Sequence, residues 1–132
     1  TVLIGMDAGT AINSADADGT VAIGTRAGAA LTSGQKNLAL GFEALNSSAT
    51  GDDNIAIGYQ AMGNANSDSS LYNVVIGNYA GDAFGTAAIH SVVAIGYNAL
   101  TNATHANVAG TVAVGREAGT AIVDSQGTTA IG

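Results

Sequence analysis

The sequence predicts an all-β fold, a parallel β-solenoid, and two observations lead to it. First, a short apolar run ending in glycine returns along the whole chain, with glycines at 5, 24, 41, 58, 77, 96, 115 and 132. A repeat of this length indicates stacked units rather than a compact globule. Second, consecutive glycines lie 17 or 19 residues apart, so the spacings differ by two and never by one. Because strand side chains alternate between faces, only even insertions keep each strand the same way round.

The predicted strands are the apolar runs themselves, which give about seven coils of 17–19 residues. Val and Ile are strand formers, and a glycine in every repeat would weaken a helix by ~1 kcal/mol each relative to Ala. The segments at 29–31, 82–84 and 120–122 predict a second, less regular strand, and the segments at 15–19, 51–53 and 66–70 predict polar turns. The first strands are expected at 2–4, 21–23, 38–40, 55–57, 74–76, 93–95, 112–114 and 129–131.

Fixed positions surround each strand. The residue before the strand is Thr or Asn in seven of eight repeats, with Val92 as the exception, and we expect these side chains to form a hydrogen-bonded ladder between coils. An alanine follows each of the first seven glycines by three residues. The structural repeat therefore comprises Gly5, Gly24, Gly41, Gly58, Gly77, Gly96 and Gly115 with Ala8, Ala27, Ala44, Ala61, Ala80, Ala99 and Ala118.

Each strand is apolar on both faces, which is typical of strands buried on both faces. The outer residues, such as Val21 and Ile23, point one way, and the middle residue, Ala22, points the other. One face can line the coil, and the other needs a cover. We expect the small Ala to be the residue against which a partner packs. Since this chain has no spare element, identical partner chains are the expected cover.

Composition restricts the function. The chain has 132 residues, enough for a single domain at 1–132, and it contains no Cys and few aromatic residues. Its net charge of −7 argues against nucleic acid and against an anionic membrane surface. No apolar run reaches the roughly 18 residues of a membrane span, so membrane insertion by this segment is not expected. The chain starts and stops inside a motif, which suggests a window from a longer fibrous protein.

The pattern [Thr/Asn]-Val-Ala-Ile-Gly-x-x-Ala resembles the head repeats of trimeric autotransporter adhesins, the YadA type. It is also similar to the Asn-x-Ala-Ile-Gly-Tyr-x-Ala repeats of phage tail fibres, which Asn54 to Ala61 matches best. The resemblance covers the whole chain. It implies a left-handed β-roll, a homotrimer, and an extracellular place on a virion tail fibre or cell surface. The adhesin repeats are shorter, which favours the phage fibre.

Three functions follow as expectations. The first is a structural, non-enzymatic segment of a trimeric surface fibre that supports host recognition and needs no cofactor. The alternative is a trimeric adhesin head that itself binds host glycans or matrix. A remote alternative is an ice-binding β-solenoid, which would need a flat, regular array of Thr side chains. In each case the main expected partner is the chain itself, with a host glycan or receptor as the second.

Motifs for catalysis are absent, and we predict no catalytic residue. The two histidines, His90 and His105, fall in a linking segment and in a polar turn column. No nucleophile elbow, HExxH motif or Walker loop occurs.

Carboxylates close together in turns suggest weak calcium candidates at Asp16, Asp18, Asp52 and Asp53. The EF-hand spacing is not met, so solvated acidic turns are the favoured interpretation and no metal site is predicted.

The two residues after each glycine form exposed columns. In one column Arg26 falls between Asp7 and Glu43, which predicts an ion ladder between coils. In the other, Phe42 falls beside Tyr59. Stabilisation of the stack is the plain interpretation, since exposed ion pairs contribute less than ~1 kcal/mol. The functional interpretation is a candidate glycan strip of Phe42, Tyr59 and Tyr97.

Overall fold

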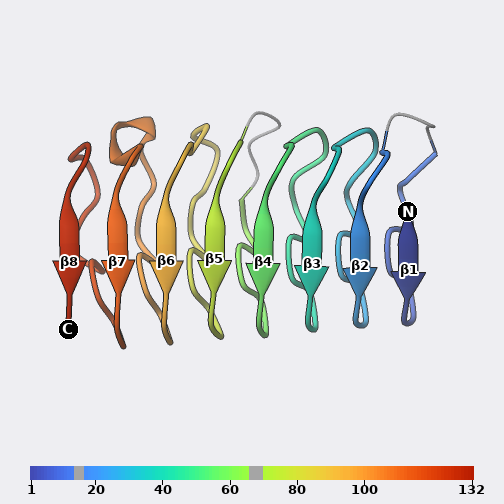
Figure 1. The fold of residues 1–132 in the computed structure, drawn as a ribbon, viewed down its shortest axis with the longest axis horizontal. Coiled ribbons are helices and arrows are strands. Elements are labelled where there is room, and N and C mark those ends of the chain that lie inside the picture. Colours follow the sequence, from blue (N-terminus) through green and yellow to red (C-terminus); the bar gives the residue numbers. More distant parts are fainter. Residues whose placement is uncertain (14–16, 66–69) are drawn as a thin grey trace.

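A computed structural model describes residues 1–13, 17–65 and 70–132. The described chain forms one parallel sheet whose eight strands follow chain order, and Figure 1 shows them side by side and pointing the same way. The prediction of an all-β parallel solenoid is confirmed. The described helix, η1 (Ala106–Val108), is too short to cross a membrane, as are all described helical segments. The strands are β1 (Val2–Ile4), β2 (Val21–Ile23), β3 (Leu38–Leu40), β4 (Ile55–Ile57), β5 (Val74–Ile76), β6 (Val93–Ile95), β7 (Val112–Val114) and β8 (Thr129–Ile131).

The strand register is constant along the stack. Ala56 pairs with Ala39 in the 17-residue repeat before it and with Val75 in the 19-residue repeat after it. Both repeat lengths therefore bring equivalent residues level with one another. The two extra residues are taken up in the connections, as the even spacing predicts.

The motif glycine ends each strand because a side chain does not fit there. Gly24 has φ +134°, a backbone conformation that L-residues rarely adopt. A Cβ atom on Gly24 would lie 2.4 Å from the carbonyl oxygen of Gly41 in the next coil. The glycines thus stack directly over one another, and this column requires glycine in every coil.

The predicted second strand is wrong: residues 29–30, 82–83 and 120–121 belong to turns, and residues 31, 84 and 122 have no regular structure. The second and fourth residues after each motif glycine have positive φ, as at Arg26 (φ 58°) and Leu45 (φ 50°). Two left-handed residues so close together bend the chain sharply and prevent an extended strand. Backbone hydrogen bonds between coils nevertheless continue through this corner, from Arg26 N to Met6 O and from Gly28 N to Ala44 O, each 2.9 Å long.

The assignment of strand faces is also wrong. The middle alanines, such as Ala22 and Ala56, are fully buried within the single chain, whereas the flanking Val and Ile residues remain partly open to solvent. The Ala side therefore lines the coil, and no partner is needed to cover it. The Ala residues three positions after the motif glycine, Ala27 to Ala99, are likewise fully buried. Small residues on these walls keep the coil narrow.

One large side chain per coil fills the space between these small walls, and it comes from either of two positions. Where the fourth residue after the motif glycine is Gly, the seventh is large, as in Gly28 with Leu31 and Gly81 with Phe84. Where the fourth is Leu or Met, the seventh is small, as in Leu100 with Ala103. A Cβ atom on Gly81 would lie 2.6 Å from the Phe84 ring. The two positions therefore share one volume.

The predicted ladder before the strands is present and buried. Asn54 donates from Nδ2 to Asn37 Oδ1 (3.2 Å) and to Ser70 O (2.9 Å). Its own Oδ1 accepts from Asn73 N (3.2 Å) and Asn73 Nδ2 (2.9 Å). The buried side-chain amides thus form hydrogen bonds with one another and with carbonyl groups of the adjacent turns, as is usual for buried polar groups. At Val92 the ladder of side chains ends, although Val92 N still donates to Asn73 Oδ1.

Asn54→Thr is expected to lower the free energy of unfolding by about 1–2 kcal/mol. Thr occupies the equivalent positions 20 and 111, so its shape fits the column. One hydroxyl cannot replace both ends of the amide, and bonds to Asn37 and Asn73 are lost. Urea unfolding checks the value, with the exposed Asn107→Thr as a control that should change stability by less than about 0.5 kcal/mol. Equal stabilities for the two variants would show that the ladder contributes nothing specific.

Candidate functional site

One continuous surface of the described chain is the outward face of the sheet. It consists of the first and third residues of every strand, and its side chains point away from the coil because those of the middle residues point inward. In β2 and β4 to β7 both residues are half-buried, and in β3 Leu40 is 40% exposed. This outward face comprises Val2, Val21, Leu38, Ile55, Val74, Val93, Val112 and Thr129 with Ile4, Ile23, Leu40, Ile57, Ile76, Ile95, Val114 and Ile131.

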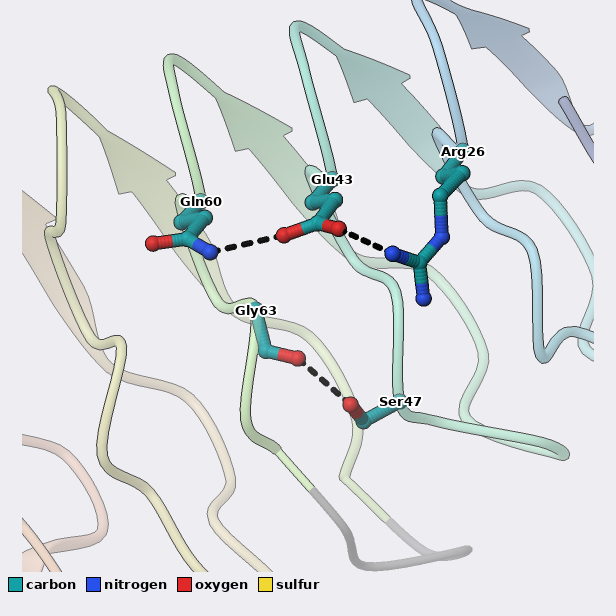
Figure 2. A network of polar contacts seen from close by, with 5 residues as sticks. All are labelled: Arg26, Glu43, Ser47, Gln60 and Gly63. Carbon is teal, nitrogen blue, oxygen red and sulfur yellow. Dashed lines mark hydrogen bonds and ion pairs between the residues drawn. The ribbon is translucent and has the colours of Figure 1, made fainter. Parts of the chain in front are cut away.

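A line of polar side chains crosses three coils just beyond the strand ends. Figure 2 shows Arg26, Glu43 and Gln60 in this line, with Glu43 in the centre. Glu43 accepts from Arg26 Nη1 through one carboxylate oxygen and from Gln60 Nε2 (2.7 Å) through the other. The predicted ion ladder is thus present between Arg26 and Glu43, and Gln60 extends it. No ion pair joins Arg26 to Asp7 within residues 1–13 and 17–65.

Ser47 Oγ donates to Gly63 O (2.6 Å) on a separate part of the same coils (Figure 2). Polar contacts therefore connect neighbouring coils at two places, beyond the strand ends and at Ser47. Each is an exposed or half-buried contact, and each stabilises the stack by less than about 1 kcal/mol.

An aromatic row runs along four consecutive coils. Phe42 and Tyr59 stack with their ring centroids 5.1 Å apart and their planes at 7°. Tyr79 lies 5.2 Å from Tyr59 and 6.1 Å from Tyr97, with planes at 64° and 87°. The Arg116 guanidinium lies 5.9 Å from the centre of the Tyr97 ring and closes the row. We call Phe42, Tyr59, Tyr79 and Tyr97 the aromatic row.

The sequence pattern placed three of these four residues in one strip but assigned Tyr79 to the neighbouring column. The first position after Gly77 holds Asn78, whose Oδ1 accepts from Tyr59 N (2.9 Å), and the ring comes from the next residue. Tyr79 thereby connects Tyr59 with Tyr97. The signal that could have revealed it was the replacement of an aromatic residue by Asn at 78 with a Tyr directly after it.

The calcium candidates do not come together. Asp18 Oδ1 accepts from its neighbour Gly19 N (3.2 Å), and Asp52 Oδ1 accepts from Gln35 N (2.7 Å). Asp16 lies outside the described residues. In the described part of the chain no three His, Cys, Asp or Glu side chains are grouped as a metal site requires. The carboxylates of Asp18 and Asp52 thus act as acceptors for turn amides.

The histidines lie in separate environments. His105 is exposed, and its Nδ1 is 3.2 Å from Thr104 Oγ1. His90 is half-buried, and its backbone carbonyl accepts from Gly110 N (3.2 Å). His90 forms an isolated parallel bridge with Leu71 in the adjacent coil, and His105 lies in a bend. The Thr side chains of the ladder column are also unavailable at the surface, since Thr20 and Thr111 are buried. That column therefore does not present the flat, exposed array of Thr side chains that ice binding requires.

Burial raises the pKa of the Asp82 carboxyl, and a hydrogen bond from Asn64 Nδ2 (2.9 Å) partly opposes this. Loss of solvent, reinforced by the nearby Tyr59, raises the pKa of Tyr79 as well. Among the residues that the structure describes, neither group has a partner that would make it a general acid or base. The raised pKa of Asp82 therefore affects the pH dependence of the free energy of unfolding.

Asp82→Asn is expected to raise the free energy of unfolding at neutral pH by a few tenths of a kcal/mol, since solvent screens this half-buried group. An acid whose pKa is raised on folding stabilises the fold below its unfolded pKa of about 4, and this contribution is lost as pH rises through the folded pKa. The amide keeps an acceptor for Asn64 and carries no charge. The gain should therefore vanish at acidic pH, which urea unfolding across a pH series checks. Asp124→Asn, at an exposed carboxylate, is the control, and a gain that persists unchanged at low pH would contradict the explanation.

No family of known proteins, no curated protein sequence and no solved structure matches this chain.

Proposed function

We propose that the chain is a structural, non-enzymatic segment of a surface fibre, in which each copy is a left-handed β-roll and three copies associate as a homotrimer. The fibre would be a phage tail fibre shaft or head, or a related surface fibre, and would hold a recognition tip away from the virion or cell. The single observation that carries the proposal is the outward face, a strip continuous over all eight strands that is aliphatic apart from Thr129 in β8.

The size of the outward face supports a self-contact. With strands ~4.8 Å apart, its two columns extend roughly 34 Å along the stack and about 10 Å across it. A continuous apolar strip of this size, on the order of a few hundred Å², is comparable to the largest apolar patch of a typical monomer, and such patches often serve in binding. Its side chains contact one another along the columns, but their outer sides have no cover within the described chain.

The repeat of the outward face indicates which partner fits. Rows of side chains recur at every strand, so a partner must have the same spacing to interdigitate along the whole length. A second copy of this chain has that spacing. The two columns are aliphatic apart from Thr129 and carry no charge, so copies can approach closely despite the net charge of −7.

Light scattering of the purified chain tests this function directly. One chain has a mass of 12.8 kDa, and a homotrimer has three times that mass at all concentrations down to the micromolar range. Electron microscopy of the same sample should show short rods. A stable monomer, or particles that grow without limit, would contradict a trimeric fibre segment.

The alternative function, an adhesin head that itself binds host glycans, is favoured by one observation: the aromatic row is exposed and continuous. Binding of a glycan would not exclude the structural role, because the row lies beyond the strand ends and the outward face lies on the strands.

A further inference from the structure

Beyond the structural role, we propose that the aromatic row is a binding site for a neutral, extended glycan that lies along the stack of coils. The rings of the row contact one another between coils but lie outside the buried core. Phe42, Tyr59 and Tyr97 are 40%, 40% and 45% exposed, and none belongs to the buried core cluster. Large aromatic residues kept at a surface mark contact sites.

The row offers both kinds of contact that a sugar requires. Phe42 and Tyr59 stack in parallel, so the apolar surface that they offer to the C–H face of a pyranose is the part of each ring that the other leaves uncovered. The three tyrosines add hydroxyls that donate and accept hydrogen bonds. Tyr79 is turned by 64° from Tyr59 and by 87° from Tyr97, so the row presents ring surfaces in more than one direction. Asn78 lies beside it, with Oδ1 engaged by Tyr59 N and its amide NH2 on an exposed residue.

The spacing of the row suits a linear chain of sugars. Each coil contributes one ring, and neighbouring ring centroids are 5.1, 5.2 and 6.1 Å apart. A pyranose unit in an extended glycan advances by a similar length. One sugar can therefore meet each coil, and an oligosaccharide meets the four coils from Phe42 to Tyr97 together.

Charge selects against anionic ligands. The chain has a net charge of −7, and the carboxylate of Glu43 lies in the column beside the row. The two arginines nearest the row are already paired, Arg26 with Glu43 and Arg116 with Glu117 at 3.0 Å. These pairings weaken the attraction of both guanidinium groups for sulfated or phosphorylated glycans, which the net charge repels, whereas neutral glycans avoid this repulsion.

Titration with neutral linear hexasaccharides (cellohexaose, maltohexaose and chitohexaose) tests the site by calorimetry and by tyrosine fluorescence. The chain has no Trp and four Tyr, of which three lie in the row, so the fluorescence reports on it. We expect at least one hexasaccharide to bind, and Tyr59→Ala with Tyr97→Ala to weaken it by at least about tenfold. Tyr72→Ala is the matched control, because Tyr72 is 61% exposed but lies outside the row, and it should leave affinity within about twofold.

Four outcomes would overturn the site: no binding of any of the three at millimolar concentration, equal loss in Tyr72→Ala, preference for a heparin hexasaccharide, or loss of assembly in the double variant. The last would place the row in the contact between copies. Light scattering of each sample separates this proposal from the fibre function. A chain that assembles but binds no glycan would contradict the glycan site alone. A monomer that binds glycan would contradict the fibre function alone.

Discussion

Ala56→Asp is expected to unfold the chain, whereas Ile57→Asp leaves it folded and abolishes its self-association. The two residues are adjacent in β4 and point to opposite sides of the sheet. Ala56 is fully buried between Ala39 and Val75, where a carboxylate has no partner. Burying it costs on the order of 5 kcal/mol or more, comparable to the whole stability of a small domain.

Ile57 lies on the outward face between Leu40 and Ile76 and is only half-buried in the single chain. Asp there loses strand propensity, at a cost of about 1 kcal/mol, but its charge reaches solvent. In an assembly the same charge would be buried against a partner. The fold therefore survives and the association does not.

Circular dichroism and light scattering distinguish the two variants. Ala56→Asp should lose its β signal, and Ile57→Asp should keep it at the mass of a monomer. Thr86→Asp adds the same charge at an exposed residue of a connection and should still assemble. An Ile57→Asp chain that assembles like the wild type would remove the outward face from the contact between copies. A folded Ala56→Asp chain would contradict the buried Ala wall.

The strands and their register could be predicted from the sequence because both depend on local pattern. Val, Ile and the motif glycine define the strand and its end, and the even spacing keeps equivalent residues level. The Asn ladder was predictable for the same reason, since equal positions in equal coils must stack.

The orientation of the strand faces could not be predicted from the strands alone. A run such as Ile55-Ala56-Ile57 is apolar on both sides, so the pattern does not say which side is enclosed. The answer depends on the opposite wall of the coil, where one large residue already fills the interior. Only the side of the strand that carries the small Ala residue fits against this large residue. The place of Tyr79 in the aromatic row could not be predicted from the spacing either. Its ring reaches the row from the second position after the motif glycine, whereas the other three rings come from the first.

The shared volume inside each coil leads to a rescue experiment at Leu100 and Ala103. Leu100 is fully buried and left-handed (φ 53°), and Ala103 is also fully buried. Leu100→Gly removes a core leucine, which costs about 3–5 kcal/mol, and regains about 1 kcal/mol from the left-handed backbone. Ala103→Leu alone places two large residues in one space and costs about 1–3 kcal/mol.

Together the two changes should restore stability to within about 1 kcal/mol of the wild type, because the coil then has the arrangement of Gly28 with Leu31. Two adjacent coils, with Ile12 and Leu31 at the seventh position, already share that arrangement. Urea unfolding of all four chains gives the coupling energy. In the control, Thr86→Leu in the Leu100→Gly background adds a leucine at an exposed site and should rescue nothing. If the double variant were as unstable as the sum of the single ones, the two positions would not share one space. The alternation of Gly and Leu along the chain would then need another explanation.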